Sequence, residues 1–263
     1  MNARRAGRLV RASVASLALA ASGCVNFWEL PIETPIKPKL DVSGFQRVLV
    51  AGFVAGGSEE VDSNLETVRL LRSQLRTKSS LRVIEADVIP LTEVAAQEFR
   101  RPEAAPPPDG APPPDLLPSK ITNEKELEAY DQLFANVEYW KKLGEEYQQP
   151  LIVTGTILFT PHAAAGMVQS TRDAYDDFGR RVTRPVRTYM ERKGFILRPK
   201  FIFIDGRTGA QLHSETFREQ VLYNASQNTP PLSSYFELMD RLLPSVLGAM
   251  SSQKVRGTRV LLR

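Results

Sequence analysis

Cysteine is almost absent from this sequence, which has one, Cys24, in 263 residues. A secreted chain with a single thiol cannot form an internal disulfide, so the thiol must be free, modified or bonded to another chain. Histidine is scarce too: His162 and His213 lie on different segments, without a cysteine or an acidic pair at metal-ligand spacing. The sequence therefore predicts neither a disulfide framework nor a metal centre.

Motifs for catalysis or cofactor binding are also missing. The pair Gly56-Gly57 follows an apolar run as a phosphate-binding loop would, but it lacks the Gly-Lys-Ser/Thr ending, and Glu59 and Glu60 would repel phosphate. The aspartates between residues 173 and 177 have no glycine or spaced glutamate to complete a calcium loop. Ser58 does not stand in a Gly-x-Ser-x-Gly elbow. We therefore expect no enzyme and no cofactor.

The first 24 residues are typical of an exported precursor. Four arginines without an acid precede a small and apolar run, 12–21, which at about ten residues is too short to span a bilayer core of roughly 30 Å as a helix. Ala21-Ser22-Gly23-Cys24 follows and resembles the bacterial lipobox, although the family more often has Leu in place of Ala21. The resemblance predicts a signal peptide over 1–23 and acyl chains, such as palmitate, on Cys24. The alternative is a plain signal peptide or anchor that contains a buried cysteine.

The excess of positive charge belongs to this leader. The whole chain has 34 basic and 30 acidic residues, and the leader contains four of the basic residues and no acidic one. Without those four the mature chain has 30 of each sign, so it is neutral and gives no reason to expect nucleic acid as a partner. Val25 stands where a signal for inner-membrane retention would often have Asp. By resemblance to sorting in two-membrane bacteria, this favours the periplasmic face of the outer membrane.

The mature chain is predicted to be one α/β domain behind a tether. Residues 24–44, with three prolines, predict an extended tether. The order β-α-β-α-β-β-α over 45–263 favours a mixed α/β (α+β) domain of three layers, with helices covering a mixed sheet. Apolar runs predict strands at 47–53, 81–84, 151–159, 195–204 and 210–222, with a candidate edge strand at 258–262, and amphipathic segments predict helices from residue 63, at 123–148 and at 233–250.

A proline-rich loop interrupts this domain at 102–118, where eight prolines include two runs of three. Proline fixes φ and removes the amide donor, so the segment cannot form a helix or the interior of a sheet. We expect a disordered or polyproline segment. A polyproline ligand for a partner protein is the alternative.

Three stretches carry a resemblance to a known family: RVLVAGF at 47–53, PLIVTGTILF at 150–159, and KFIFIDGRTGAQL at 200–212. Together they resemble the α/β domain shared by the curli-secretion lipoproteins and the amino-terminal part of the Tol-system translocation protein. Curli-secretion proteins insert amphipathic hairpins that form a membrane pore, and the segment 160–198 lies where one would be expected. Its central part, 175–193, is rich in charge and lacks sustained apolar alternation, so we do not expect a pore.

One local feature stands out by charge. Residues 179–200 contain eight basic groups and one acid, Glu191. Such a segment could contact lipid phosphates, cell-wall carboxylates or an acidic partner. The alternative is a solvated β-ribbon whose charges discourage edge pairing. The candidate contact residues are Arg180, Arg181, Arg184, Arg187, Arg192 and Lys193.

These observations predict a periplasmic lipoprotein that acts without catalysis, through contacts with an envelope protein. The first alternative is a subunit of an oligomeric outer-membrane secretion complex of the curli-secretion type, which would make the chain a homo-oligomer. The second is an enzyme whose site exists only in the folded chain. Architecture cannot choose among them, because function depends on sites rather than on folds.

Overall fold

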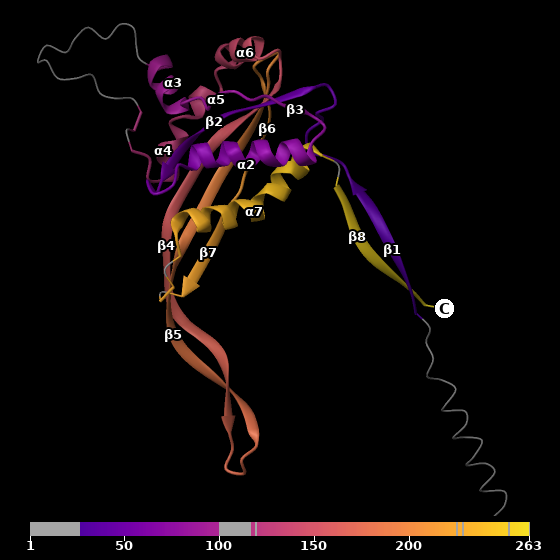
Figure 1. Ribbon diagram of the computed structural model, residues 1–263, viewed down its shortest axis with the longest axis vertical. Helices are drawn as coiled ribbons and strands as arrows, with labels where there is room; N and C mark the ends of the chain where they lie inside the picture. The colour runs from indigo at the N-terminus through magenta and orange to yellow at the C-terminus, as the bar shows by residue number, and fades with distance from the viewer. Residues whose placement is uncertain are drawn as a thin grey trace, which may run out of the picture. The chain divides into compact units, whose positions relative to one another are not determined.

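The computed structural model describes residues 27–99, 117–118, 120–224, 226–227, 229–251 and 253–262 (Figure 1). The predicted lipidation site, Cys24, and most of the proline-rich loop lie outside the described residues. The chain divides into two compact units, one over 39–251 and one that joins the segment before residue 39 to the segment after 251.

A mixed six-stranded sheet organises the larger unit. Its strands lie in the order β3-β2-β4-β5-β6, and β7 pairs with β5 as well. β2 is parallel to β3 and β4, and β5 is antiparallel to β4, β6 and β7. The bounds are β2 Arg47–Gly57, β3 Arg82–Val83, β4 Leu151–Tyr175, β5 Arg181–Asp205, β6 Gln211–Thr216 and β7 Glu219–Asn224.

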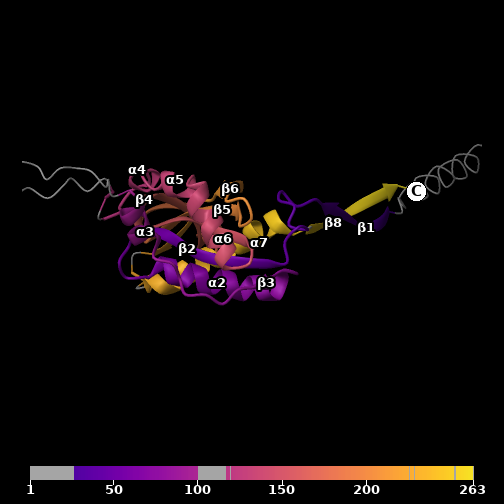
Figure 2. The same ribbon diagram turned by 90° about the horizontal axis from the view of Figure 1, so that it is seen from above.

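Helices cover both faces of this sheet (Figure 2), which confirms the predicted mixed α/β class and its three layers. The apolar runs at 47–53 and 151–159 are buried on both faces, as strands in the middle layer must be. The helices are α2 Ser63–Lys78, α3 Leu91–Glu98, α4 Glu124–Glu128, α5 Asp131–Phe134, α6 Val137–Glu146 and α7 Pro231–Met250.

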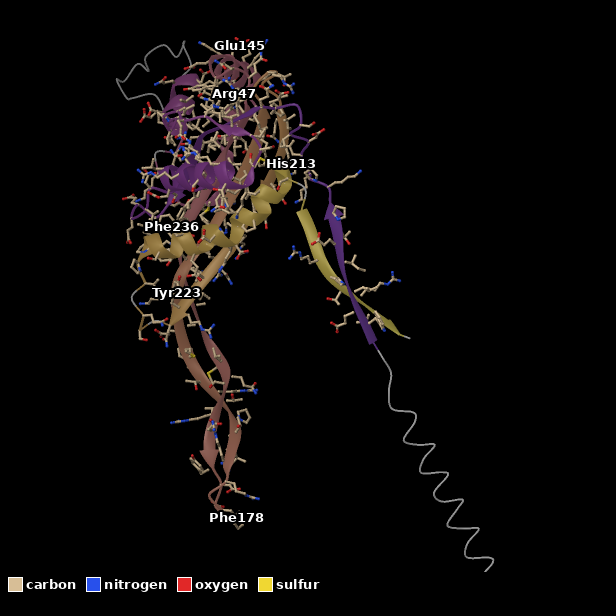
Figure 3. All side chains as sticks on the ribbon, turned by 45° about the vertical axis from the view of Figure 1, so that its right-hand side comes forward. Arg47, Glu145, Phe178, His213, Tyr223 and Phe236 are labelled. Carbon is tan, nitrogen blue, oxygen red and sulfur yellow. The ribbon has the colours of Figure 1, made fainter. Side chains whose placement is uncertain are left out.

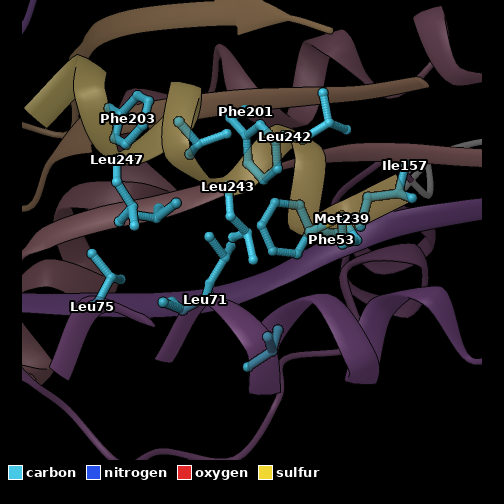
Figure 4. Packing of buried hydrophobic residues seen from close by; sticks show 14 of the residues in the cluster. Phe53, Leu71, Leu75, Ile157, Phe201, Phe203, Met239, Leu242, Leu243 and Leu247 are labelled. Carbon is cyan, nitrogen blue, oxygen red and sulfur yellow. The ribbon is translucent and has the colours of Figure 1, made fainter. Parts of the chain in front are cut away.

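Two hydrophobic clusters hold the layers together. The first lies between the sheet and helices α2 and α7, and Figure 4 shows Leu71 of α2 and Leu243 of α7 facing Phe53 and Phe201 of the strands. The second lies under α3–α6, where Trp140 is fully buried and its Nε1 donates to the carbonyl of Leu133 at 2.9 Å. Because each face of the sheet has its own cluster, neither helix layer can be removed without exposing a core.

Several elements differ from their predicted extents. The helix expected over 123–148 is three short helices, α4–α6, and the strand expected over 210–222 is divided into β6 and β7 around residues 217–218. The strand at 81–84 has only two paired residues, and α3 was not predicted. The largest difference is the segment 160–198, where β4 and β5 continue without a break into one long hairpin.

The smaller unit is a two-stranded antiparallel ribbon of β1, Phe27–Ile36, and β8, Gln253–Leu262. The predicted tether is therefore a paired strand over most of its described length, and the predicted edge strand at 258–262 pairs with it rather than with the main sheet. Residues 253–262 belong to this smaller unit. Ten consecutive residue pairs join segments more than 200 positions apart, a pairing that local sequence patterns do not reveal.

Candidate functional site

The predicted basic segment lies on the hairpin that β4 and β5 form. β2 pairs with β4 as far as Phe159, and β7 pairs with β5 as far as Arg192. Beyond these positions the two strands pair only with each other, up to Tyr175 opposite Arg181. The ribbon from 165 to 175 extends about 35 Å at about 3.3 Å per residue, and Figure 3 shows Phe178 at its far end.

The six predicted contact residues lie on this hairpin but do not form one patch. Directly opposite residues of an antiparallel pair share a face, and successive residues alternate between faces. Arg181, Arg187 and Lys193 therefore lie on one face, which we call the odd face, and Arg184 and Arg192 lie on the other, the even face. Arg180 lies in the turn between the strands. The basic segment is therefore part of a solvated ribbon, and its positive charges are divided between the two faces.

Two of the six basic side chains have carboxylate partners in the hairpin. Asp176 accepts hydrogen bonds from the backbone N–H of Arg180, at 2.8 Å, and from its Nε, at 2.9 Å. The backbone hydrogen bond from Arg180 is the main cause that lowers the pKa of Asp176 below its usual value. Asp173 forms an ion pair with Arg181 and accepts from Thr183 Oγ1. Of the aspartates considered as a cation site, Asp176 thus closes the turn and Asp173 pairs with residues of the opposite strand.

The other four, Arg184, Arg187, Arg192 and Lys193, form no ion pair within the part of the chain that the structure describes. Arg172 is a further basic residue of the hairpin that the charge pattern did not single out, because it precedes the basic segment 179–200. Arg172 lies directly opposite Arg184 on the even face, and both are exposed. Like charges opposite one another on a ribbon destabilise it, so this pair is a feature that the fold alone does not explain.

The hairpin also exposes apolar side chains that the sequence pattern did not single out. Tyr175 is 75% exposed and Phe178, in the turn, is 83% exposed. The guanidinium of Arg180 lies 5.3 Å from the centre of the Phe178 ring. Met167 and Tyr189 form a cross-strand pair on the odd face that is also mostly exposed. A count of exposed aromatics at the predicted turn could have found the first two residues.

The glycine pair considered as a phosphate loop lies at the end of β2, and the amides of Gly57 and Ser58 donate to backbone carbonyls. The backbone N–H of Gly57 donates to the carbonyl of Ile121 at 2.8 Å, and that of Ser58 donates to the carbonyl of Phe159 at 2.7 Å. A Cβ at Gly57 would lie 2.0 Å from the same Phe159 oxygen, and its φ is +98°. The glycine is needed for close approach of the loop to β4, and these two amides are already bonded. Glu59 forms an ion pair with Lys120 across the loop.

The two histidines have separate surroundings. His213 stacks on Phe203 with ring centres 6.0 Å apart, and its Nε2 lies 3.5 Å from Glu215 Oε2. His162 lies on the hairpin opposite Gly194. Among the described residues, no group of three or more His, Cys, Asp or Glu side chains could hold a metal ion.

The terminal ribbon carries apolar side chains next to the predicted anchor. Trp28 is 59% exposed, Leu30 44% and Ile32 39%, and the register puts all three on one face. Trp28 lies four residues after Cys24, a span of at most about 14 Å in an extended chain. In the described ranges, no helix is long and apolar enough to cross a membrane.

The chain has a distant likeness to a solved structure, whereas two other comparisons find nothing. No family model matches the chain, and no curated protein matches it. Among solved structures, the crystal structure of the lipoprotein GNA1162 from Neisseria meningitidis aligns with a TM-score of 0.33 at 12% sequence identity, over 76% of this chain and 97% of that one. A likeness this distant assigns no family, and the resemblance to the curli-secretion and Tol domains stays a prediction.

Proposed function

We propose that this chain is a lipoprotein of the bacterial envelope, anchored by acyl chains on Cys24, whose α/β domain acts through protein contacts rather than catalysis. The observation that carries the proposal is the sequence Ala21-Ser22-Gly23-Cys24 behind a basic and apolar leader, because it contains the only thiol of the chain. Each buried CH₂ of an acyl chain contributes about 0.8 kcal/mol to membrane binding, so two or three chains give a stable anchor where one chain binds only marginally. Val25 supports the periplasmic face of the outer membrane as the location.

The non-catalytic part of the proposal rests on how the candidate polar groups are used. The loop amides of Gly57 and Ser58 are bonded to backbone carbonyls. The carboxylates of Asp173 and Asp176 form ion pairs with Arg181 and Arg180 within the hairpin. Amides bonded to carbonyls cannot bind a phosphate at the same time, and carboxylates held in ion pairs are less available to a cation. This use of the polar groups supports protein contacts as the role for the domain.

An oligomeric secretion complex is the second candidate. It is favoured by the hairpin at 160–198, which forms at the position where curli-secretion proteins carry an insertion. Light scattering of the detergent-solubilised, lipidated protein separates the two candidates. A ring would give a mass many times that of one mature chain, whereas an interaction module would give a monomer or a complex with one partner.

The test of the first candidate is site-specific photocrosslinking in intact envelopes. The crosslinker replaces one exposed apolar residue at a time, on the hairpin at Met167 or Tyr189, on β6 at Leu212, and at the start of α7 at Leu232. We expect one protein to be captured in stoichiometric amount from one of these surfaces and not from the others, which serve as matched controls. Failure to capture a protein from any of the surfaces would contradict the proposal.

A further inference from the structure

We propose that the tip of the β4/β5 hairpin docks onto a lipid surface that exposes anionic phosphate head groups. The tip consists of Tyr175 and Phe178 at the turn, Val182 beside it, and the opposed pair Arg172 and Arg184 behind it. The inference deepens the proposed function, on which it rests for the presence of a membrane near the protein. It assigns a contact to side chains that the lipid anchor does not use.

The apolar part of the tip is fully formed yet open to water. Phe178 is 83% exposed, Tyr175 75% and Val182 37%. Tyrosine is enriched where a membrane meets water, because its ring leaves water while its hydroxyl stays hydrated. Phenylalanine is typical of segments that bury an apolar face at that interface. The guanidinium of Arg180 lies over the ring of Phe178, so a positive charge is already next to the outermost aromatic side chain of the hairpin.

The charge behind the tip has one sign. From residue 160 to the turn and back to 196, the even face carries Arg172, Arg184 and Arg192 and no acidic residue. The acids of the hairpin lie on the odd face or in the turn, where Asp173 and Asp176 are paired with other arginines. Arg172 and Arg184 repel each other across the ribbon, and an anion between them would remove that repulsion.

The spacing of apolar and basic groups matches the depth of a membrane interface. Tyr175 and Arg172 are three residues apart on β4, which is about 10 Å along the strand. Side chains that bind at an interface enter about 5–10 Å into the boundary between head groups and acyl chains. With Phe178 and Tyr175 at that boundary, the opposed arginines lie at the level of the phosphates.

The dimensions of the tip favour a lipid surface over a protein partner. A stable protein contact buries about 800 Å² on each partner. The end of a ribbon of two strands about 4.8 Å apart is too narrow to supply that area. A lipid surface needs only a few side chains, because each arginine near an anionic surface increases binding about fivefold and a buried phenylalanine about tenfold or more.

Sedimentation with vesicles tests the proposal without the anchor. The protein is the mature chain, residues 24–263, carrying Cys24→Ser so that no thiol can be acylated. Vesicles contain phosphatidylcholine alone or with about a third phosphatidylglycerol. We expect binding to the anionic vesicles only. Because the acyl chains are excluded from this assay, its result does not depend on whether Cys24 is lipidated in the cell.

Two pairs of matched variants locate the contact. Phe178→Ser should weaken binding at least tenfold, whereas Tyr189→Ser, another exposed aromatic of the hairpin, should change it less than threefold. The double variant Arg172→Glu/Arg184→Glu should weaken binding at least tenfold as well. The double variant Arg187→Glu/Lys193→Glu makes the same change of charge on the odd face. The factor by which it weakens binding should be less than a third of the factor for the first double variant.

The proposal would be overturned by absence of binding, by equal binding to both kinds of vesicle, or by equal losses within either matched pair of variants. Capture of a protein, rather than lipid, by a photocrosslinker at position 178 in intact envelopes would also overturn it. Circular dichroism of each variant checks that the ribbon and the helices have formed. All the substituted residues are exposed, so we expect unchanged spectra.

Discussion

Replacing residues 165–191 with the turn Asn-Gly should leave the larger unit folded. The replaced residues include no member of either hydrophobic core. Four of their largest apolar side chains, Met167, Tyr175, Phe178 and Tyr189, are between 60 and 83% exposed. Ala164 and Arg192 lie directly opposite each other, so a two-residue type I′ turn can join them.

The expected change in the free energy of unfolding is small and positive. A ribbon of two strands is only marginally stable by itself, so its cross-strand pairs do little more than offset the entropy of ordering it. A two-residue connection in place of 27 residues lowers the entropy cost of loop closure by about 2 kcal/mol. We therefore expect the shortened chain to be as stable as the parent, or more stable by up to about 2 kcal/mol.

Urea unfolding measures this change through the fluorescence of Trp140, which is fully buried in the second core cluster. The matched control is Leu71→Ala, which removes a buried side chain from the first cluster and should cost about 2–5 kcal/mol. A loss of 3 kcal/mol or more in the shortened chain, or its failure to fold, would refute the view that the ribbon is an appendage. The shortened chain should also fail to bind anionic vesicles.

Three further substitutions test the packing of the domain. Tyr235→Phe removes a buried hydroxyl that bonds to Thr67 and should cost about 1 kcal/mol in urea unfolding; no measurable cost would contradict this. Burial raises the pKa of Asp205, but the hydrogen bonds from Arg207 have the larger effect. The pKa of Asp205 therefore lies below its ordinary value of 3.8. Its stabilisation is therefore present above that pH and lost in stronger acid, and Asp205→Asn should flatten the fall of the unfolding free energy below pH 3.8; an unchanged slope would count against the pair. Gly155→Ala should cost about 3 kcal/mol or more, because φ is +144° and the new Cβ would lie 1.8 Å from a carbonyl oxygen of β5; a normal melting temperature would exclude that clash.

The layered core could be predicted from sequence because its signals are local. The runs at 47–53 and 151–159 are apolar on both faces, and the helix from residue 63 has its apolar positions on one side. Two glycines around 206–209 predicted the antiparallel turn between β5 and β6. In each case the pattern within a short window specifies both the element and the face that it buries.

The terminal ribbon could not be predicted, because the partners of its strands lie more than 200 residues apart. Nothing within Phe27–Ile36 identifies Gln253–Leu262 as its neighbour, and the prolines in β1 suggested a tether instead. Pairing between distant segments depends on the whole fold and leaves no signal in either segment alone.

The hairpin is an intermediate case. Its charges were visible in the sequence, but treating them as one patch ignored the alternation of strands, which puts Arg181 and Arg184 on opposite faces. The opposition of Arg172 and Arg184 needed the register, since a shift of one residue would change every facing pair. The exposed tip at Phe178 became a candidate site only when the turn was placed at the end of the ribbon.

The identity of the amino-terminal residue of the mature protein tests the central claim most directly. Mass spectrometry of the protein extracted from membranes should find a chain that begins at Cys24 and carries acyl chains on that residue. An amino-terminal peptide with an unmodified Cys24, or with the residues of 1–23 still attached, would contradict the account.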